Sequence, residues 1–357
     1  MWPYWFLFGV PVWLAVKHLR PVAKPARRWG GLWRVVFVLL VLMIGFRHEV
    51  GGDWEPYVEH VEMVKNVSLQ EALIASKDPA ASLVNWLAAQ TGLGIYFVNT
   101  VCAALFAWGL LAFCRAQPRP WLALVVAVPY MVTVVAMGYT RQGTALGLAM
   151  LGLVGLADRK TLRFVLLVAL AATFHKSALI LMPLAILAGT KRKIWMVIWV
   201  VLSTVLFYLL LLADSVEILQ KNYIEAEYQS EGAALRLAMN AMPAVLFLLF
   251  RHKFVMPQTD RVFWTWMSLG ALGFVVLLVV SPSSTAVDRL ALYWIPLQLF
   301  VLSRLPDAIG KPNGLNSRWV YGVVVYSAVV LFVWLFFATH AKHWLPYQFY
   351  PLVWLFK

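Results

Sequence analysis

Residues 161–189 read TLRFVLLVALAATFHKSALILMPLAILAG and decide the fold of this chain. The stretch is apolar, yet clusters of lysine and arginine lie at both of its ends, at 159–163 and 191–193. Because such clusters mark cytoplasmic loops, the stretch must cross a membrane an even number of times. Two full crossings need about 40 residues, which the stretch does not have. It therefore predicts two short helices broken at the turn 174–177, which lies below the outer membrane surface and lines a polar cavity.

The composition indicates a polytopic membrane protein. Of the 357 residues, 62% are hydrophobic and 13% are charged, and no soluble core could bury so much apolar surface. A net charge of +14 would suggest nucleic acid in a soluble protein, but cytoplasmic basic loops explain it here. The lipid bilayer is thus the expected partner, and nucleic acid is not. The opening Met1-Trp2-Pro3-Tyr4-Trp5 lacks the basic region of a signal peptide, so the first apolar run is expected to stay as a helix.

Apolar segments recur along the whole chain, and basic clusters separate alternate pairs of them. The segments are 2–16, 33–46, 94–114, 121–138, 141–157, 162–174, 177–189, 194–212, 236–250, 262–280, 289–303 and 319–339. Placing the clusters in the cytoplasm puts 20 of the 30 lysines and arginines inside and 13 of the 16 acids outside. The sequence therefore predicts an all-α bundle of about 12 crossings, with both termini extracytoplasmic and residues 1–357 forming one integral membrane domain.

Two of the predicted extracytoplasmic loops are long, at 47–92 and 213–235. Within 55–75, apolar residues alternate with acids in a way that predicts a helix on the membrane surface. The acidic loop 213–235 is expected to be helical as well. Neither loop is long enough to form a domain of its own.

The first candidate site follows the second apolar segment, at Arg47-His48-Glu49-Val50-Gly51-Gly52-Asp53-Trp54-Glu55-Pro56-Tyr57. The glycine pair lets the backbone turn sharply. One interpretation is an interfacial anchor with a turn. In the other, Arg47 binds an anion while Glu49 or Asp53 holds a sugar hydroxyl or accepts its proton.

Two further candidates combine a cation with a polar neighbour at membrane depth. Arg141 begins the 141–157 segment and could simply extend to the interface, but Gln142 beside it needs buried partners. His175 and Lys176 form the break described above, and intramembrane ionisable groups usually face a cavity. There a neutral histidine can act as a base, and the lysine supplies a point charge for phosphate.

The last candidates lie near the C-terminus. Arg289 and Tyr293 are four residues apart and share one helical face, although Asp288 could pair with Arg289 instead. Residues 347–351, Tyr-Gln-Phe-Tyr-Pro, form either an aromatic belt or a surface on which sugars stack. The predicted topology places all the cations of these candidate sites on one membrane face. They are suited to a large anion such as a lipid-linked pyrophosphate.

These residues, in this order, resemble the EpsG-like family of bacterial exopolysaccharide polymerases, which is similar in role to the Wzy-type O-antigen polymerases. The resemblance covers nearly the whole chain. Its motifs are an Arg-x-x-x-Gly-x-Asp-x-x-x-Tyr element, an Arg-Gln pair, a Phe-His-Lys-Ser turn and an arginine–tyrosine helix start. Here they are Arg47, Gly51, Asp53 and Tyr57; Arg141 and Gln142; Phe174 to Ser177; and Arg289 and Tyr293.

The resemblance implies a GT-C-like glycosyltransferase of the bacterial inner membrane that needs no metal or other cofactor and acts on the periplasmic side. It would transfer a growing glycan from undecaprenyl pyrophosphate to the non-reducing sugar of another lipid-linked repeat unit. A flippase and a chain-length regulator of the same pathway are the partners that this reaction implies.

The resemblance also implies roles for the candidate residues. The leaving pyrophosphate would be stabilised by Arg141, Arg289 and Lys176, with help from Arg47. His175 or Asp53 would take the proton, and Glu49 is the further acid considered. Other contacts to substrate would come from Tyr57, Gln142 and Tyr293.

Three other functions fit parts of the pattern. A GT-C transferase using a polyprenyl monophosphate sugar would depend on Glu49 or Asp53. A flippase or transporter of lipid-linked oligosaccharide would need polar residues toward both membrane faces, whereas the inner halves of the segments here are apolar. A membrane O-acyltransferase would use His175.

Overall fold

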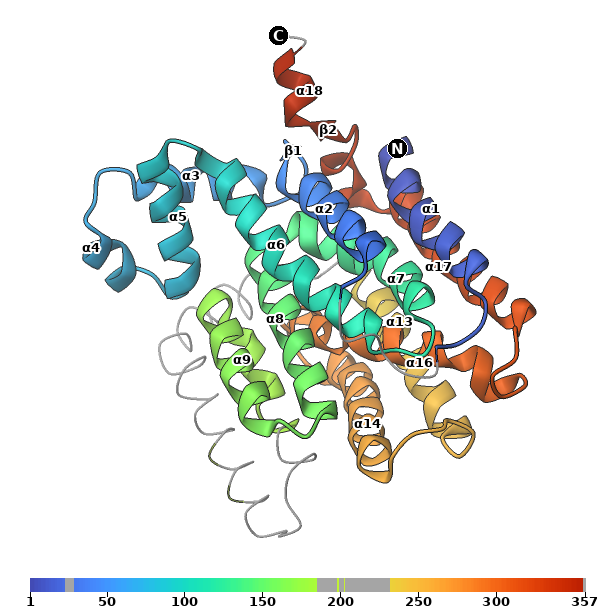
Figure 1. Ribbon diagram of the computed structural model, residues 1–357. Coiled ribbons are helices and arrows are strands. Elements are labelled where there is room, and N and C mark those ends of the chain that lie inside the picture. The colour runs from blue at the N-terminus through green and yellow to red at the C-terminus, as the bar shows by residue number, and fades with distance from the viewer. Residues whose placement is uncertain (23–28, 185–197, 199–201, 203–231, 356–357) are drawn as a thin grey trace.

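The computed structural model describes the chain except for residues 23–28, 185–197, 199–201, 203–231 and 356–357 (Figure 1). In chain order the elements are α1 (Trp2–Lys17), α2 (Gly31–Gly45), β1 (Arg47–His48), α3 (Trp54–Met63), α4 (Leu69–Ile74), α5 (Pro79–Thr91), α6 (Gly94–Arg115), α7 (Pro120–Ala127), η1 (Val128–Ala136), α8 (Thr140–Ala157), α9 (Thr161–Phe174), η2 (Lys176–Leu181), α13 (Ala233–Phe250), α14 (Gln258–Val280), α15 (Ser284–Ala291), η4 (Leu292–Trp294), α16 (Ile295–Ile309), α17 (Ser317–Phe337), η5 (Thr339–His343), β2 (Gln348–Phe349) and α18 (Tyr350–Leu355). The described chain is thus a helical bundle, which confirms the predicted fold class.

Five helices of the described chain are long and apolar enough to span a membrane: α6, α13, α14, α15 continued by α16, and α17. The 12 crossings and the outward termini stay predictions. The predicted segment 194–212 and most of the loop 213–235 lie outside the described residues.

The predicted break in 161–189 is present. Helix α9 ends at Phe174, His175 adopts an extended conformation with φ −158°, and the 3₁₀ helix η2 begins at Lys176. His175 and Lys176 therefore lie where the helix direction is interrupted. The depth of this break in a membrane remains a prediction.

Helix α8 forms the centre of the bundle and is buried along nearly its whole length. It packs against α6 and α9, and glycines permit the close approach to α6. A Cβ added at Gly147 would lie 2.5 Å from the Cα of Phe106, so only glycine fits there. Small residues at such crossings are typical of membrane helices. This packing fixes α8, and with it Arg141 in its first turn.

The loop at 47–92 contains three helices rather than the single surface helix predicted at 55–75. Helix α3 ends at Met63, and α4 starts again after Ser68. Ser68 and Glu71 form a capping box, in which each side chain bonds the backbone N–H of the other. Such a box favours a new helix start over continuation of α3. The third helix, α5, packs against α6 and α9.

The C-terminal segment is bound to the start of the chain. Strand β2 pairs with β1, and the Tyr4 hydroxyl donates to the Trp344 carbonyl over 2.6 Å. Trp344 itself is buried and donates its Nε1–H to the Thr133 carbonyl in the π-helical stretch η1. The two termini consequently lie at the same end of the bundle (Figure 1).

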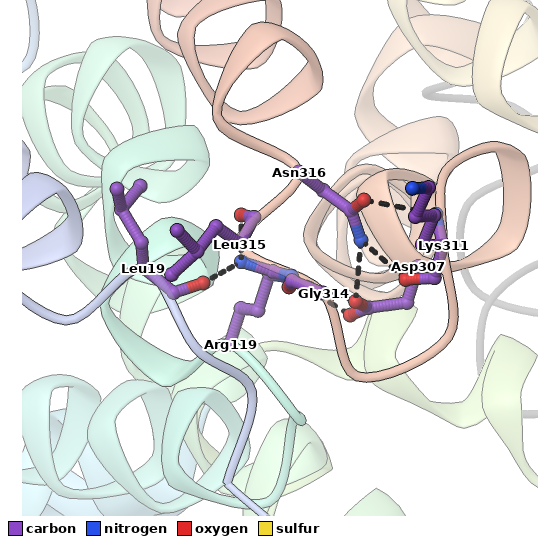
Figure 2. A network of polar contacts seen from close by, with 7 residues as sticks. All are labelled: Leu19, Arg119, Asp307, Lys311, Gly314, Leu315 and Asn316. Atoms are coloured by element: carbon purple, nitrogen blue, oxygen red, sulfur yellow. Dashed lines mark hydrogen bonds and ion pairs between the residues drawn. The ribbon is translucent and has the colours of Figure 1, made fainter.

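A polar network joins three segments far apart in the sequence (Figure 2). Arg119, before α7, binds both carboxylate oxygens of Asp307 in α16, at 2.9 and 2.7 Å. It also donates to the carbonyls of Leu19, Gly314 and Leu315. The network thus connects the α6–α7 turn to the loop before α17 and to the segment after α1.

Candidate functional site

Arg141 links helix α8 to two helices of the outer loop. Its Nη1 lies 2.8 Å from Oδ2 of Asp78, the residue directly before α5. Its backbone N–H donates to the Tyr57 hydroxyl of α3 over 3.4 Å, and the guanidinium lies 5.7 Å from the centre of the Tyr57 ring. The Arg141 side chain is 37% exposed, and its Nε is buried with no hydrogen-bond partner among the described residues. Arg141 is therefore oriented by its neighbours while part of its donor capacity stays unused.

Asp53 lies within electrostatic reach of two of the predicted cations. Burial raises the pKa of its carboxyl above the ordinary value of 3.8, while the charges of Arg289 and Arg141 act in the opposite direction. A carboxylate in this setting is a better proton acceptor than an exposed one. The turn that carries Asp53 requires glycine, because Gly51 has φ +107° and an added Cβ would lie 2.3 Å from the Met137 carbonyl oxygen.

Arg289 is joined to α8 through its backbone. The Gln142 side-chain amide donates to the Arg289 carbonyl over 2.7 Å, so the buried amide finds the partner it needs. The Arg289 side chain is exposed. Asp288 does not pair with it: the Asp288 carboxylate binds Arg236 of α13 in a bidentate pair at 2.9 and 2.8 Å. The sequence left open whether Asp288 neutralises Arg289. The geometry favours an Arg289 side chain that remains available to bind an anion.

The break after α9 brings a histidine into the same region. His175 Nδ1 lies 2.5 Å from the Ser177 hydroxyl, which in turn lies 3.2 Å from the hydroxyl of the buried Tyr293. Arg141 and Arg289 are both within electrostatic reach of His175. Lys176 donates its backbone N–H to Asp78. Asp78 therefore connects α5, α8 and the break, although burial still raises its pKa.

Arg47 has a different environment from the one expected of an anion ligand. Its side chain is 2% exposed and donates to the carbonyls of Ile44 and Val50 and to the Thr140 hydroxyl, at 2.6, 3.1 and 2.7 Å. Every nitrogen of the guanidinium thus has a partner inside the protein. Arg47 closes the turn after α2 and ties it to α8, which is a structural role.

Glu49 forms no ion pair with a lysine or arginine among the described residues. It has φ +51° and an exposed side chain, and its carboxylate lies 3.7 Å from His48 Nε2. His48 belongs to an aromatic group in which Tyr96 and Tyr350 stack with ring centres 3.8 Å apart. The segment 347–351 therefore packs internally, with β2 bonded to β1.

The site thus assembles from α3, α5, α8, the break at His175, and α15 with η4. It brings together Asp53, Tyr57, Arg141, Gln142, His175, Lys176, Arg289 and Tyr293. Arg141 and Arg289 lie near the Asp53 carboxylate and the His175 imidazole, and Lys176 lies near a second carboxylate, that of Asp78. This arrangement is suited to a polyanionic leaving group and a proton transfer. Within the described part of the chain no cluster of three or more metal-binding side chains was found.

Sequence reasoning did not single out Asp78 or Arg236, and it assigned no role to Ser177. Asp78 directly precedes Pro79, and an Asp-Pro step is a common helix start, which was a usable signal for α5. Ser177 is part of the Phe-His-Lys-Ser turn but bonds to Tyr293, 116 residues away along the chain. The Arg236–Asp288 pair joins two helices whose proximity no local pattern predicts.

Comparison with known proteins gave one match, to a family. No curated protein and no solved structure gave a match. A family model described as the EpsG family matches residues 31–349, which is most of the chain and includes every element of the site. The chain therefore belongs to the EpsG family, and by that membership to polysaccharide polymerase-like proteins of the membrane.

Proposed function

We propose that this protein is a polysaccharide polymerase that uses undecaprenyl pyrophosphate as the carrier of its donor glycan. It transfers the glycan to the non-reducing end of another lipid-linked repeat unit, on the extracytoplasmic face of the inner membrane. The observation that carries this proposal is the convergence of Arg141 and Arg289 on Asp53 and His175, with Lys176 and Asp78 beside them.

Stabilisation of the leaving group is the first task of these residues. Pyrophosphate gains negative charge as the glycosidic bond breaks, and preorganised cations lower the energy of that state. Arg141 and Arg289 offer planar guanidinium groups that match phosphate oxygens, and Lys176 adds a point charge. Arg47 contributes indirectly, because it holds the turn that leads to Asp53.

Activation of the acceptor sugar is the second task. Its hydroxyl oxygen forms a bond to the anomeric carbon of the donor, the bond from that carbon to the pyrophosphate oxygen breaks, and the hydroxyl proton passes to the base. We assign the base to Asp53. Accepting a proton neutralises Asp53, whereas it would make His175 a third positive charge beside Arg141 and Arg289.

The remaining residues orient these groups. Ser177 and Tyr293 hold the His175 ring, which then serves as a hydrogen-bonding contact to substrate. Gln142 fixes the backbone that carries Arg289, and Tyr57 lies against Arg141.

A transferase with a polyprenyl monophosphate donor is the second candidate, because Asp53 beside two arginines suits that donor as well. Purified protein should be offered the same repeat unit on undecaprenyl pyrophosphate and on undecaprenyl monophosphate, with elongation followed by mass spectrometry. Elongation from the pyrophosphate donor alone supports the polymerase. Elongation from the monophosphate alone would replace it with the second candidate.

A further inference from the structure

A cavity of about 440 Å³ lies between α13, α17 and the π-helical stretch η1. Its walls include Leu235 and Met239 of α13 and Val330, Val333 and Phe337 of α17. The volume is in the range of pockets that enclose organic ligands. None of the chemistry proposed above uses this cavity.

The hydrophilic side chains of the cavity gather at one end, and three aromatic side chains that carry a polar atom, those of Tyr130, Tyr326 and Trp334, also line it. Arg236, near the start of α13, lies there together with Thr339 and His340, which follow the end of α17. The other lining residues of α17 extend back to Tyr326, a rise of about 17 Å at 1.5 Å per residue. One polar end and a long apolar wall match an amphiphile with a phosphate head and a hydrocarbon chain.

Two buried polar atoms in the lining have no partner in the part of the chain that the structure describes. Tyr326 Oη and Trp334 Nε1 are both enclosed, and neither has a hydrogen bond among the described residues. A buried donor without an acceptor costs free energy, so such groups usually mark a missing partner. Trp334 lies within one helical turn of the polar end, where an oxygen of a bound head group would satisfy it.

The cavity is accessible from the surrounding bilayer. Leu235, Val329 and Phe337 line it and are also exposed. In a membrane these side chains face lipid tails, and a hydrocarbon chain can enter between the helices without leaving the apolar phase.

The polar end also borders the proposed anion site. Arg236 pairs with Asp288 at 2.8 Å, and Asp288 directly precedes Arg289. We propose that the cavity binds the polyprenyl chain of a lipid-linked substrate, with the phosphate directed toward Arg236 and Arg289. The inference rests on the proposed function, in which two lipid-linked glycans must meet at one site and each brings a long chain.

Binding of undecaprenyl phosphate tests the inference without requiring turnover. Wild type and variants are placed in phospholipid nanodiscs, and the bound lipid is measured by native mass spectrometry. V330W and V333W fill the cavity, and V325W is the matched control, because Val325 is exposed on the same helix and does not line it. We expect V330W and V333W to bind undecaprenyl phosphate about tenfold more weakly than wild type. V325W should bind it as wild type does. W334F keeps an aromatic ring at this position, removes the N–H donor and should weaken binding by about threefold.

The outcomes separate this inference from the proposed function. If V330W and V333W bind undecaprenyl phosphate as V325W does, the cavity assignment is wrong, whatever the polymerase activity. Equal loss of phosphatidylethanolamine from the filled variants would assign the cavity to bulk lipid and overturn the inference. Selective loss of undecaprenyl phosphate supports the cavity even if the wild type fails to elongate a pyrophosphate-linked glycan.

Discussion

Two arginine–aspartate pairs lie beyond the two ends of the helix formed by α7 and η1, and they differ in how completely they are satisfied. Arg119 is 3% exposed and gives its hydrogen bonds to Asp307 and to three carbonyls. Arg141 is 37% exposed, pairs with Asp78 through one nitrogen, and keeps a buried Nε without a partner in the described chain. The Arg119–Asp307 pair thus completes a structural network, whereas the Arg141–Asp78 pair leaves hydrogen-bond donors of Arg141 for a ligand.

The comparison extends to the neighbouring charges. Around Arg119 the second donor to Asp307 is neutral: the Asn316 side-chain amide donates to Asp307 and to the Lys311 carbonyl (Figure 2). Around Arg141 lies another cation, Arg289, which an aspartate next to it in the sequence does not neutralise. An excess of positive charge at one place is costly for the fold alone, and a bound anion offsets that cost.

The largest expected effect is on stability, at the satisfied pair. R119A leaves Asp307 partly buried without its cation and should lower the free energy of unfolding by about 3–5 kcal/mol. R141A should lower it by less, about 1–2 kcal/mol, because Arg141 gives Asp78 one hydrogen bond and the Lys176 backbone N–H still binds that carboxylate. Denaturant unfolding of both variants in the same detergent measures the difference. Equal losses would remove the distinction between the two pairs.

Activity, in contrast to stability, should depend mainly on the arginines of the anion site. R141A and R289A each remove a cation from the leaving group and should lower kcat for elongation by about 100-fold or more. R318A, at an exposed arginine in the first turn of α17, is the control and should elongate at the wild-type rate. Wild-type rates in folded R141A and R289A would refute the anion site.

A smaller effect is expected when Arg141 keeps its charge but loses its partner. D78N retains the shape of the side chain and removes the ion pair that orients the guanidinium. We expect about a tenfold loss in kcat/KM, the equivalent of one charge-assisted hydrogen bond. The double variant D78N/R141A should be no slower than R141A alone if Asp78 acts through Arg141. Independent, multiplying losses would instead give Asp78 a role of its own.

The local parts of this site could be predicted from the sequence. Basic clusters around 161–189 required a break, and the structure has it at His175. The Arg141-Gln142 pair and Arg289 stood out because polar residues are costly in apolar segments. Which residues lie close together in space could not be predicted from such local patterns. Asp78 was therefore missed, because it lies in a loop without a periodic signal.

Arg47 shows that sequence reasoning can also assign a binding role to a residue whose hydrogen bonds are made inside the protein. It has the sidedness and charge of an anion ligand, and it is part of the family element. Only the fold reveals that two carbonyls and the Thr140 hydroxyl occupy its donors. The same sequence pattern can give an arginine that is fully hydrogen-bonded inside the protein or one with few internal acceptors. Tertiary structure decides between them, because it sets how many carbonyls face the guanidinium.

The smallest expected effect is a displacement of the pH profile. Burial raises the pKa of Asp53 above its ordinary value, and the base must be deprotonated to accept the proton of the sugar hydroxyl. The kcat/KM of wild type should therefore fall as the pH drops through that raised pKa, at a higher pH than an exposed aspartate would give. The activity that remains in D53N should lack this acidic limb. D78N should keep it, although burial raises the pKa of Asp78 as well. An acidic limb that persists in D53N would transfer the role of base to His175, leaving the cations of the anion site in place but assigning Asp53 to orientation of the acceptor.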